Sequence, residues 1–193
     1  MALDVQTRAS FQREIRRQAQ NVLMAVEDMN ELLPRISDRS GEAPRFWYSI
    51  EAALSALGKI SDILWPGQDR KGSHARAREC RARFGIPDES VMQSRDARNG
   101  MEHFAERIDR WHRESGTRSQ VDSMIGSSSS IIGIAPSDFA RAYDPITGIV
   151  SIFGASINLR EAVREVVRLI EIVPDPDTSE ALAAAWEEFS AKS

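Results

Sequence analysis

The sequence has 193 residues, of which 41% are hydrophobic and 28% charged, and its formal net charge is −4. This length allows one domain with a sizeable core, and the composition excludes a disordered or fibrous chain. The negative net charge argues against indiscriminate binding to nucleic acids. A single cysteine, Cys80, excludes an internal disulfide. No Cys/His spacing predicts a metal site, and no cofactor is expected.

No apolar run approaches the ~20 residues that cross a bilayer. The N-terminal segment MALDVQTRASFQREIRR is amphipathic and charged, without the apolar region of a signal peptide. We therefore expect a cytoplasmic protein without membrane contact.

The first half of the sequence predicts four helices joined by short connections. The first is expected to end at Pro34, and the second covers 47–65 and ends at PGQDRKG. A short basic helix ends at FGIP, and Asp88 or Ser90 is the expected N-cap of a fourth helix. Four helices with short connections favour an antiparallel bundle.

After residue 118 the pattern changes to period two and to β-branched residues. The turn signal YDPITG separates two such stretches. Short strands are predicted within residues 119–126, 129–136 and 148–159.

Two closing helices follow this β region, the first capped by Asn158 or Ser156 and the second by Thr178 or Ser179. The predicted fold is therefore mainly α, an antiparallel helical bundle with a small β element inserted before its C-terminal helices. We expect one domain, 1–193, with the bundle in 1–115, the β element in 118–155 and the C-terminal helices in 156–193.

The segment RDARNGMEHFAERIDRWH, residues 95–112, predicts a helix that sacrifices local stability, because glycine in a helix interior costs ~1 kcal/mol relative to alanine. Its apolar residues share one stripe and its polar residues another face. On an ideal helix Arg98 and His103 would lie about 140° apart, too far to meet at one small group. Either Gly100 relaxes the helix, or a second copy supplies the complementary residue across a two-fold axis.

The string RNGMEH, an arginine and a histidine separated by four residues with asparagine after the arginine, resembles the motif of the HEPN superfamily. The continuation FAERIDRW and the later YDPITGIVSIFGASINLREAVREVVRL also resemble bacterial helical proteins of that kind. The resemblance implies metal-independent RNA cleavage by a homodimer, with the motifs of two protomers facing each other in one cleft.

The resemblance also implies a role for each motif residue. Histidine is the side-chain type in the motif that exchanges protons near neutrality, so His103 is the expected acid/base. Arg98 offers a planar fork to a phosphate. Asn99 would orient the ribose or the phosphate, and Glu102 would hold Arg98 or His103. The expected products are a 2′,3′-cyclic phosphate and a 5′-hydroxyl.

A basic segment precedes the motif: residues 69–84, DRKGSHARARECRARF, hold six Lys/Arg against two acids. Such a segment either follows a phosphate backbone or is an ordinary solvated helix face. In the first case a positive rim binds RNA through Arg95, Arg76, Arg78, Arg81 and Arg83.

Three functions remain open from the sequence. The first is a small ribonuclease, a candidate toxin or defence effector whose partner would be an antitoxin or a nucleotidyltransferase. The second is a noncatalytic HEPN-like module that binds a partner protein or a nucleotide, and the third is a structural interaction protein. In the last two, Arg98 and Glu102 would form a surface pair and His103 would be a half-buried histidine with a backbone partner. His74, His112 and the four tryptophans are expected to have structural roles.

Overall fold

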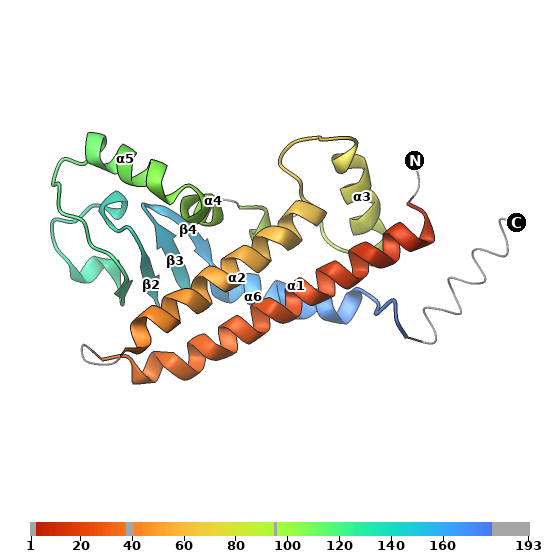
Figure 1. The fold of residues 1–193 in the computed structure, drawn as a ribbon, viewed down its shortest axis with the longest axis horizontal. Coiled ribbons are helices and arrows are strands. Elements are labelled where there is room, and N and C mark those ends of the chain that lie inside the picture. The colour runs from red at the N-terminus through yellow and green to blue at the C-terminus, as the bar shows by residue number, and fades with distance from the viewer. Residues whose placement is uncertain (1–2, 38–40, 95, 179–193) are drawn as a thin grey trace, which may run out of the picture.

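Two long helices lie side by side along the length of the molecule (Figure 1). The computed structural model describes residues 3–37, 41–94 and 96–178. Helix α1 (Val5–Leu32) begins at Asp4, whose carboxylate accepts the backbone N–H of Thr7 at 2.8 Å. A short 3-10 helix, η1 (Leu33–Arg35), contains Pro34, so the predicted end of the first helix is confirmed. Helix α2 (Glu42–Leu64) then returns along α1, beginning before the predicted residue 47.

Helix α3 (Ser73–Phe84) lies against the C-terminal end of α2 (Figure 1). It ends at Gly85, whose φ of +67° is a left-handed conformation that favours glycine. The next α-helix begins at neither predicted N-cap, Asp88 or Ser90, but at Asp96. Ser90 instead caps the 3-10 helix η2 (Val91–Gln93), because its hydroxyl accepts the backbone N–H of Met92 at 3.0 Å.

The predicted single helix over residues 95–112 is wrong. The structure has two helices here, α4 (Asp96–Glu102) and α5 (Phe104–Glu114), which are separated by one turn residue, His103. Figure 1 shows α4 and α5 beside the sheet and α3 at the other end of α2. The third and fourth helices therefore contact different parts of α2.

The four strands form one mixed sheet in the order β1-β2-β3-β4. Strand β1 pairs in parallel with β2, whereas β2 with β3 and β3 with β4 are antiparallel. Their bounds are β1 Met124–Ile125, β2 Ala142–Asp144, β3 Ile149–Ile152 and β4 Ala155–Asn158. The predicted YDPITG turn is confirmed, since the N–H of Gly148 donates to the carbonyl of Asp144 at 2.8 Å.

The strand predicted within 129–136 does not form. A 3-10 helix, η3 (Ser128–Ser130), begins this stretch, and Gly133 then adopts a φ of +84° that interrupts an extended backbone. Pro136 starts another 3-10 helix, η4 (Pro136–Asp138). Ile132 is 97% exposed, so its apolar side chain gains no burial that would hold a strand here.

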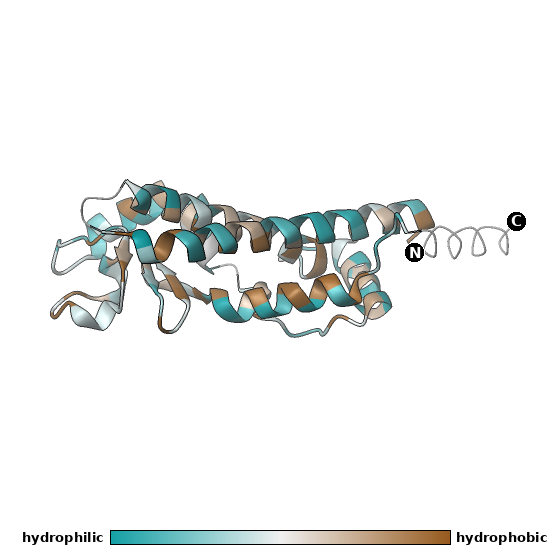
Figure 2. Ribbon diagram, turned by 90° about the horizontal axis from the view of Figure 1, so that it is seen from below, coloured by the Kyte–Doolittle hydropathy of each residue, from teal (hydrophilic) through white to brown (hydrophobic). Residues whose placement is uncertain are grey.

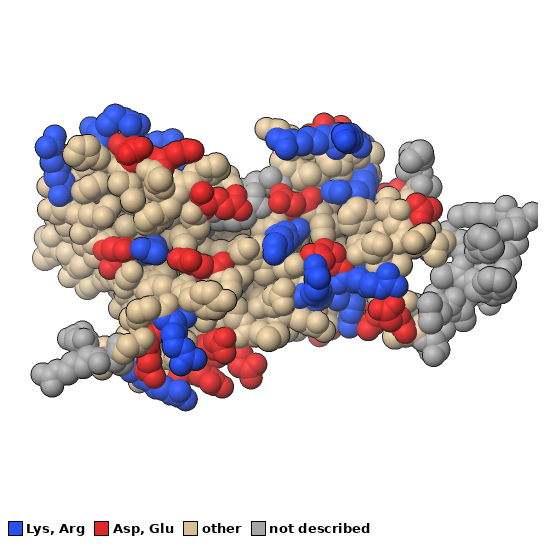
Figure 3. All heavy atoms as spheres, viewed as in Figure 1, with Lys and Arg blue, Asp and Glu red and all other residues tan. Residues whose placement is uncertain are grey.

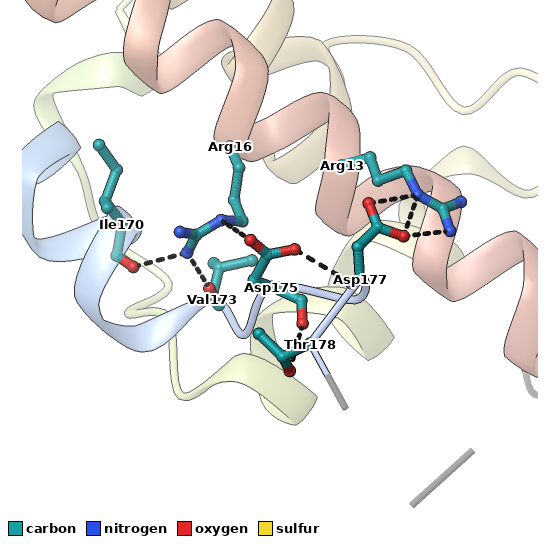
Figure 4. A network of polar contacts seen from close by, with 7 residues as sticks. All are labelled: Arg13, Arg16, Ile170, Val173, Asp175, Asp177 and Thr178. Carbon is teal, nitrogen blue, oxygen red and sulfur yellow. Dashed lines mark hydrogen bonds and ion pairs between the residues drawn. The ribbon is translucent and has the colours of Figure 1, made fainter. Parts of the chain in front are cut away.

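Helix α6 (Leu159–Ile172) follows β4 directly, and Asn158 caps it by accepting the N–H of Glu161 at 3.1 Å, as predicted. Arg16 of α1 holds the other end of α6, because its guanidinium donates to the carbonyls of Ile170 and Val173 at 2.9 and 2.8 Å (Figure 4). The following segment is held on α1 by Arg13, which binds Asp177 at 2.8 Å. The second closing helix predicted after Thr178 lies outside the described residues.

The buried core is continuous from α1 and α2 into the sheet and α6. Its fully buried side chains include Ile15 of α1, Ile60 of α2, Val150 of β3 and Val166 of α6. Figure 2 shows hydrophilic and apolar residues alternating along α1 and α6, as expected of helices with one buried side. A mainly helical fold with a small sheet before α6 is therefore confirmed.

Within the described ranges, no helix is long and apolar enough to cross a membrane.

Candidate functional site

The motif helix α4 packs closely against the sheet, and Gly100 allows this approach. A Cβ at position 100 would lie 2.9 Å from Cγ2 and 3.0 Å from Cβ of Ile152, closer than side chains normally pack. Gly100 is buried, and Ile152 is fully buried in β3. Glycine lowers the helix propensity at this position, but it allows the motif backbone to lie directly on the sheet.

His103 lies at the break between α4 and α5, with φ −108° and ψ +37°. Its backbone N–H still donates to the carbonyl of Asn99 at 2.9 Å, and its carbonyl accepts the N–H of Arg107 at 3.0 Å. His103 is thus both the end of α4 and the N-cap residue of α5. The single ideal helix on which the 140° separation was expected therefore does not continue past His103.

The His103 side chain faces solvent beside a carboxylate of α5. Its Nδ1 lies 3.4 Å from Oε1 of Glu106, and the side chains of His103 and Glu106 are 56% and 76% exposed. Glu106 was not predicted as a site residue, because a contact between Glu106 and His103 is expected only if a helix begins directly after His103. A glutamate three residues after a polar residue was the signal that could have indicated this start.

The structure describes the other predicted motif residues only in part. Arg98 belongs to α4, but its side chain is outside the described part of the structure, and Arg95 lies outside the described residues altogether. Asn99 is half-buried and Glu102 exposed, and each has an interaction partner. The structure therefore places the motif helix α4 against strands β3 and β4.

An arginine network holds the start of α5. The guanidinium of Arg141 lies over the Phe104 ring, 4.9 Å from its centroid, and Phe104 packs on Phe153 with ring centroids 5.3 Å apart. Arg141 also binds both carboxylate oxygens of Asp122, at 2.9 and 2.8 Å, and Glu51 of α2 at 3.3 Å. The bond from Arg141 lowers the pKa of Asp122, and the pKa of Arg141 is raised in turn.

A buried carboxylate holds the end of α5. Asp138 is 1% exposed and accepts the hydroxyl of Ser115 at 2.7 Å, the indole N–H of Trp111 at 2.8 Å and the hydroxyl of Thr117 at 2.9 Å. The backbone N–H of Ala135 donates to it as well, at 3.1 Å. These bonds, that of Ser115 first, lower the pKa of Asp138 despite its burial. Both ends of the helix that follows His103 are thus fixed.

Two arginines of the basic segment hold the C-terminal end of α2. Arg76 donates to the carbonyls of Asp62 and Ile63 at 3.1 and 3.3 Å, and Arg81 donates to that of Leu64. Cations here satisfy carbonyls that have no partner within the helix and interact well with its dipole. This arrangement explains two of the four predicted arginines of α3 by packing.

The other two predicted arginines of α3, Arg78 and Arg83, are exposed. Figure 3 shows Lys and Arg gathered over α3 and over α5, with acidic groups below each. Among the described residues, the Lys and Arg side chains gathered in this way on this face are therefore divided between α3 and α5.

His74 and the described tryptophans have structural surroundings. The imidazole Nε2 of His74 lies 3.0 Å from the carbonyl of Pro66, and His112 is exposed in the last turn of α5. The indole N–H groups of Trp47 and Trp65 donate to the carbonyls of Ser123 and Asp88 at 3.3 and 2.9 Å. Trp186 lies outside the described residues. Among the described residues, no group of three or more His, Cys, Asp and Glu could hold a metal ion.

The fold and this site define a mainly helical protein with an exposed histidine at a helix break beside a small mixed sheet. No protein-family model matches the chain, and searches of curated proteins and of solved structures find no significant similarity.

Proposed function

We propose that this protein is a metal-independent ribonuclease of HEPN type that acts as a homodimer. The observation that carries the proposal is the position of His103. Its imidazole is solvent-accessible at the junction of α4 and α5, next to Glu106, while Gly100 fixes the preceding turn on the sheet. A reactive side chain on a rigid support is what positioned acid/base catalysis requires.

RNA supplies its own nucleophile in this reaction. A base removes the proton of the 2′-hydroxyl, the 2′-oxygen forms a bond to phosphorus, and the bond from phosphorus to the 5′-oxygen breaks. The leaving 5′-oxygen takes a proton, so the products are a 2′,3′-cyclic phosphate and a 5′-hydroxyl. His103 would move these protons, and Arg98 would bind the phosphate as charge develops on it.

The homodimer is part of the proposal, because His103 is more than half exposed in the single chain. A second motif facing it would exclude water and bring a second arginine and histidine to the same phosphate. The biological role would be that of a toxin or defence effector, which a partner such as an antitoxin or a nucleotidyltransferase neutralises or activates.

A noncatalytic module that binds a partner protein or a nucleotide is the second candidate. One observation favours it: the packing of Gly100 on Ile152 accounts for the glycine without any chemistry at His103. In this case the surface around α4 and α5 would bind its partner equally well without the imidazole.

Purified wild-type protein and the His103→Ala variant, incubated with total RNA in the presence of a chelator, separate the two candidates. We expect cleavage by the wild type, cyclic phosphate ends, and loss of cleavage in His103→Ala with an unchanged melting temperature. His112→Ala is the matched control, because His112 is an exposed histidine on the same helix. If the chelator stops cleavage by the wild type, and His103→Ala still cleaves RNA without the chelator, the mechanism is metal-dependent and this proposal is wrong.

A further inference from the structure

We infer that Glu106 is a positioning residue that holds the imidazole of His103 in one tautomer and presents its Nε2 atom outward. The effect on catalysis rests on the proposed function, whereas the effect on the tautomer does not. The inference begins from the helix break, which places Glu106 in the first turn of the helix that His103 opens.

In this turn, a side chain at the third helical position reaches back to the N-cap residue. His103 is the N-cap residue of α5 and Glu106 is the third residue of that helix. The Nδ1 atom of His103 and Oε1 of Glu106 are 3.4 Å apart, whereas the His103 ring makes no capping hydrogen bond to the helix backbone. The carboxylate therefore faces the inner nitrogen of the ring.

The backbone on both sides of this pair is fixed. On the α4 side, Gly100 lies directly on Ile152, and on the α5 side the ring of Phe104 contacts both Arg141 and Phe153. His103 and Glu106 thus keep their relative positions through packing that neither of them provides. The pair itself is exposed, and exposed ion pairs stabilise folds little, so its consequence is orientation of the ring.

A carboxylate next to Nδ1 determines which ring nitrogen carries the proton. Because a carboxylate only accepts hydrogen bonds, it favours the tautomer with the proton on Nδ1 and the lone pair on Nε2. The Nε2 atom, which then carries the lone pair, can take a proton from a hydroxyl. Glu106 was not among the predicted positioning residues; Glu102, which was, has an interaction of its own, and its role stays a prediction.

The direct test is the tautomer of His103, read from the ¹⁵N chemical shifts of its ring in the full chain above pH 8. The signal is identified by its loss in His103→Ala. We expect the Nδ1–H form in the wild type and in Glu106→Gln, whose side-chain oxygen is still an acceptor beside Nδ1. In Glu106→Ala the Nδ1–H form should no longer predominate. Asp109→Asn removes an exposed carboxylate from the same helix and should leave the tautomer unchanged.

A wild-type ring with its proton on Nε2, or a Glu106→Ala ring with an unchanged tautomer, overturns the inference. If the wild type cleaves RNA, Glu106→Ala should lower kcat by roughly tenfold or more with little change in KM, because a carboxylate that orients a histidine acts on the transition state and does not bind substrate. Glu106→Gln should retain more activity than Glu106→Ala. Absence of cleavage by the wild type would contradict the proposed function alone, because the tautomer is measured without substrate.

Discussion

Gly100 shows how one missing side chain sets the position of a helix. The surrounding residues predict an amphipathic helix, and the glycine weakens it. In the structure Gly100 is buried against Ile152, so any side chain at this position would separate α4 from β3. The cost in helix propensity is offset by close packing of the motif on the sheet.

Gly100→Ala should therefore destabilise the protein although alanine is the better helix former. Overpacking costs roughly 1–3 kcal/mol and the gain in propensity returns about 1 kcal/mol, so we expect the free energy of unfolding to fall by about 1 kcal/mol. Urea denaturation measures this change. Gly116→Ala is the control, because nothing lies within 4 Å of a Cβ there. A Gly100→Ala variant more stable than the wild type would contradict the close approach.

Asp138 is the buried charge on which the end of α5 depends. Asp138→Asn replaces an acceptor by a group with two donor hydrogens facing the hydroxyls and the indole N–H that now donate to it. We expect a loss of about 2–3 kcal/mol in the free energy of unfolding at pH 7, the typical size for hydrogen bonds to a charged group. Urea denaturation with Asp109→Asn as the exposed control measures it.

The loss of unfolding free energy in Asp138→Asn should depend on pH in a defined direction. The pKa of Asp138 is lowered in the folded protein, so the carboxylate's contribution is complete above its unfolded pKa of about 3.9. It disappears as the pH falls below that value and through the folded pKa. The difference between the wild type and Asp138→Asn should therefore be constant from pH 7 to 5 and shrink below pH 4. A difference that grows on acidification would contradict this account.

At the scale of elements, α5 is held at its ends. No residue of α5 is buried, and Ile108 in its middle is 40% exposed. Phe104 is held at its start by Arg141 and Phe153, and Trp111 near its end by Asp138. Its apolar face is therefore available along part of its length, next to His103.

The end of α2 depends on arginines that the sequence pattern assigned to RNA. Arg81 donates to the carbonyl of Leu64 and binds Asp88 at 2.8 Å, with only 12% of its side chain exposed. Arg81→Ala should lower the free energy of unfolding by about 1–3 kcal/mol, whereas Arg78→Ala, on the exposed side of α3, should change it by less than about 0.5 kcal/mol. Thermal denaturation of the two variants measures the difference. Equal stability would show that Arg81 does not hold α2, and it would leave both arginines available to a ligand.

At the scale of the whole molecule, the proposed site requires a second chain. We expect light scattering at micromolar concentration to give twice the chain mass. Ile108→Glu should weaken the dimer at least tenfold, because it places a charge on the exposed apolar face beside the motif. Ile132→Glu, a change at a 97% exposed position in the segment after η3, is the control and should have no effect. A monomer, or a dimer insensitive to Ile108→Glu, would count against an interface at α5.

The sequence by itself determined the features that depend on neighbouring residues. Pro34, Gly85 and Asn158 end or begin helices as predicted, and Asp144 opens the predicted turn, because caps and turns are satisfied within a few residues. Helical spacing of apolar residues likewise predicted α1, α2 and α6, since an amphipathic stripe is a local pattern. The mainly helical class with a small sheet before α6 followed from these signals.

Only the tertiary structure decided the features that depend on distant residues. Gly100 lies on Ile152, Arg81 binds the end of α2, and Trp111 donates to Asp138, and none of these pairs is marked by spacing in the sequence. The break at His103 belongs with them, because α4 packs on the sheet while α5 is held by Arg141, Phe153 and Asp138. Local propensity predicts whether a helix forms, but contacts with other elements decide where it ends and which side chains it exposes.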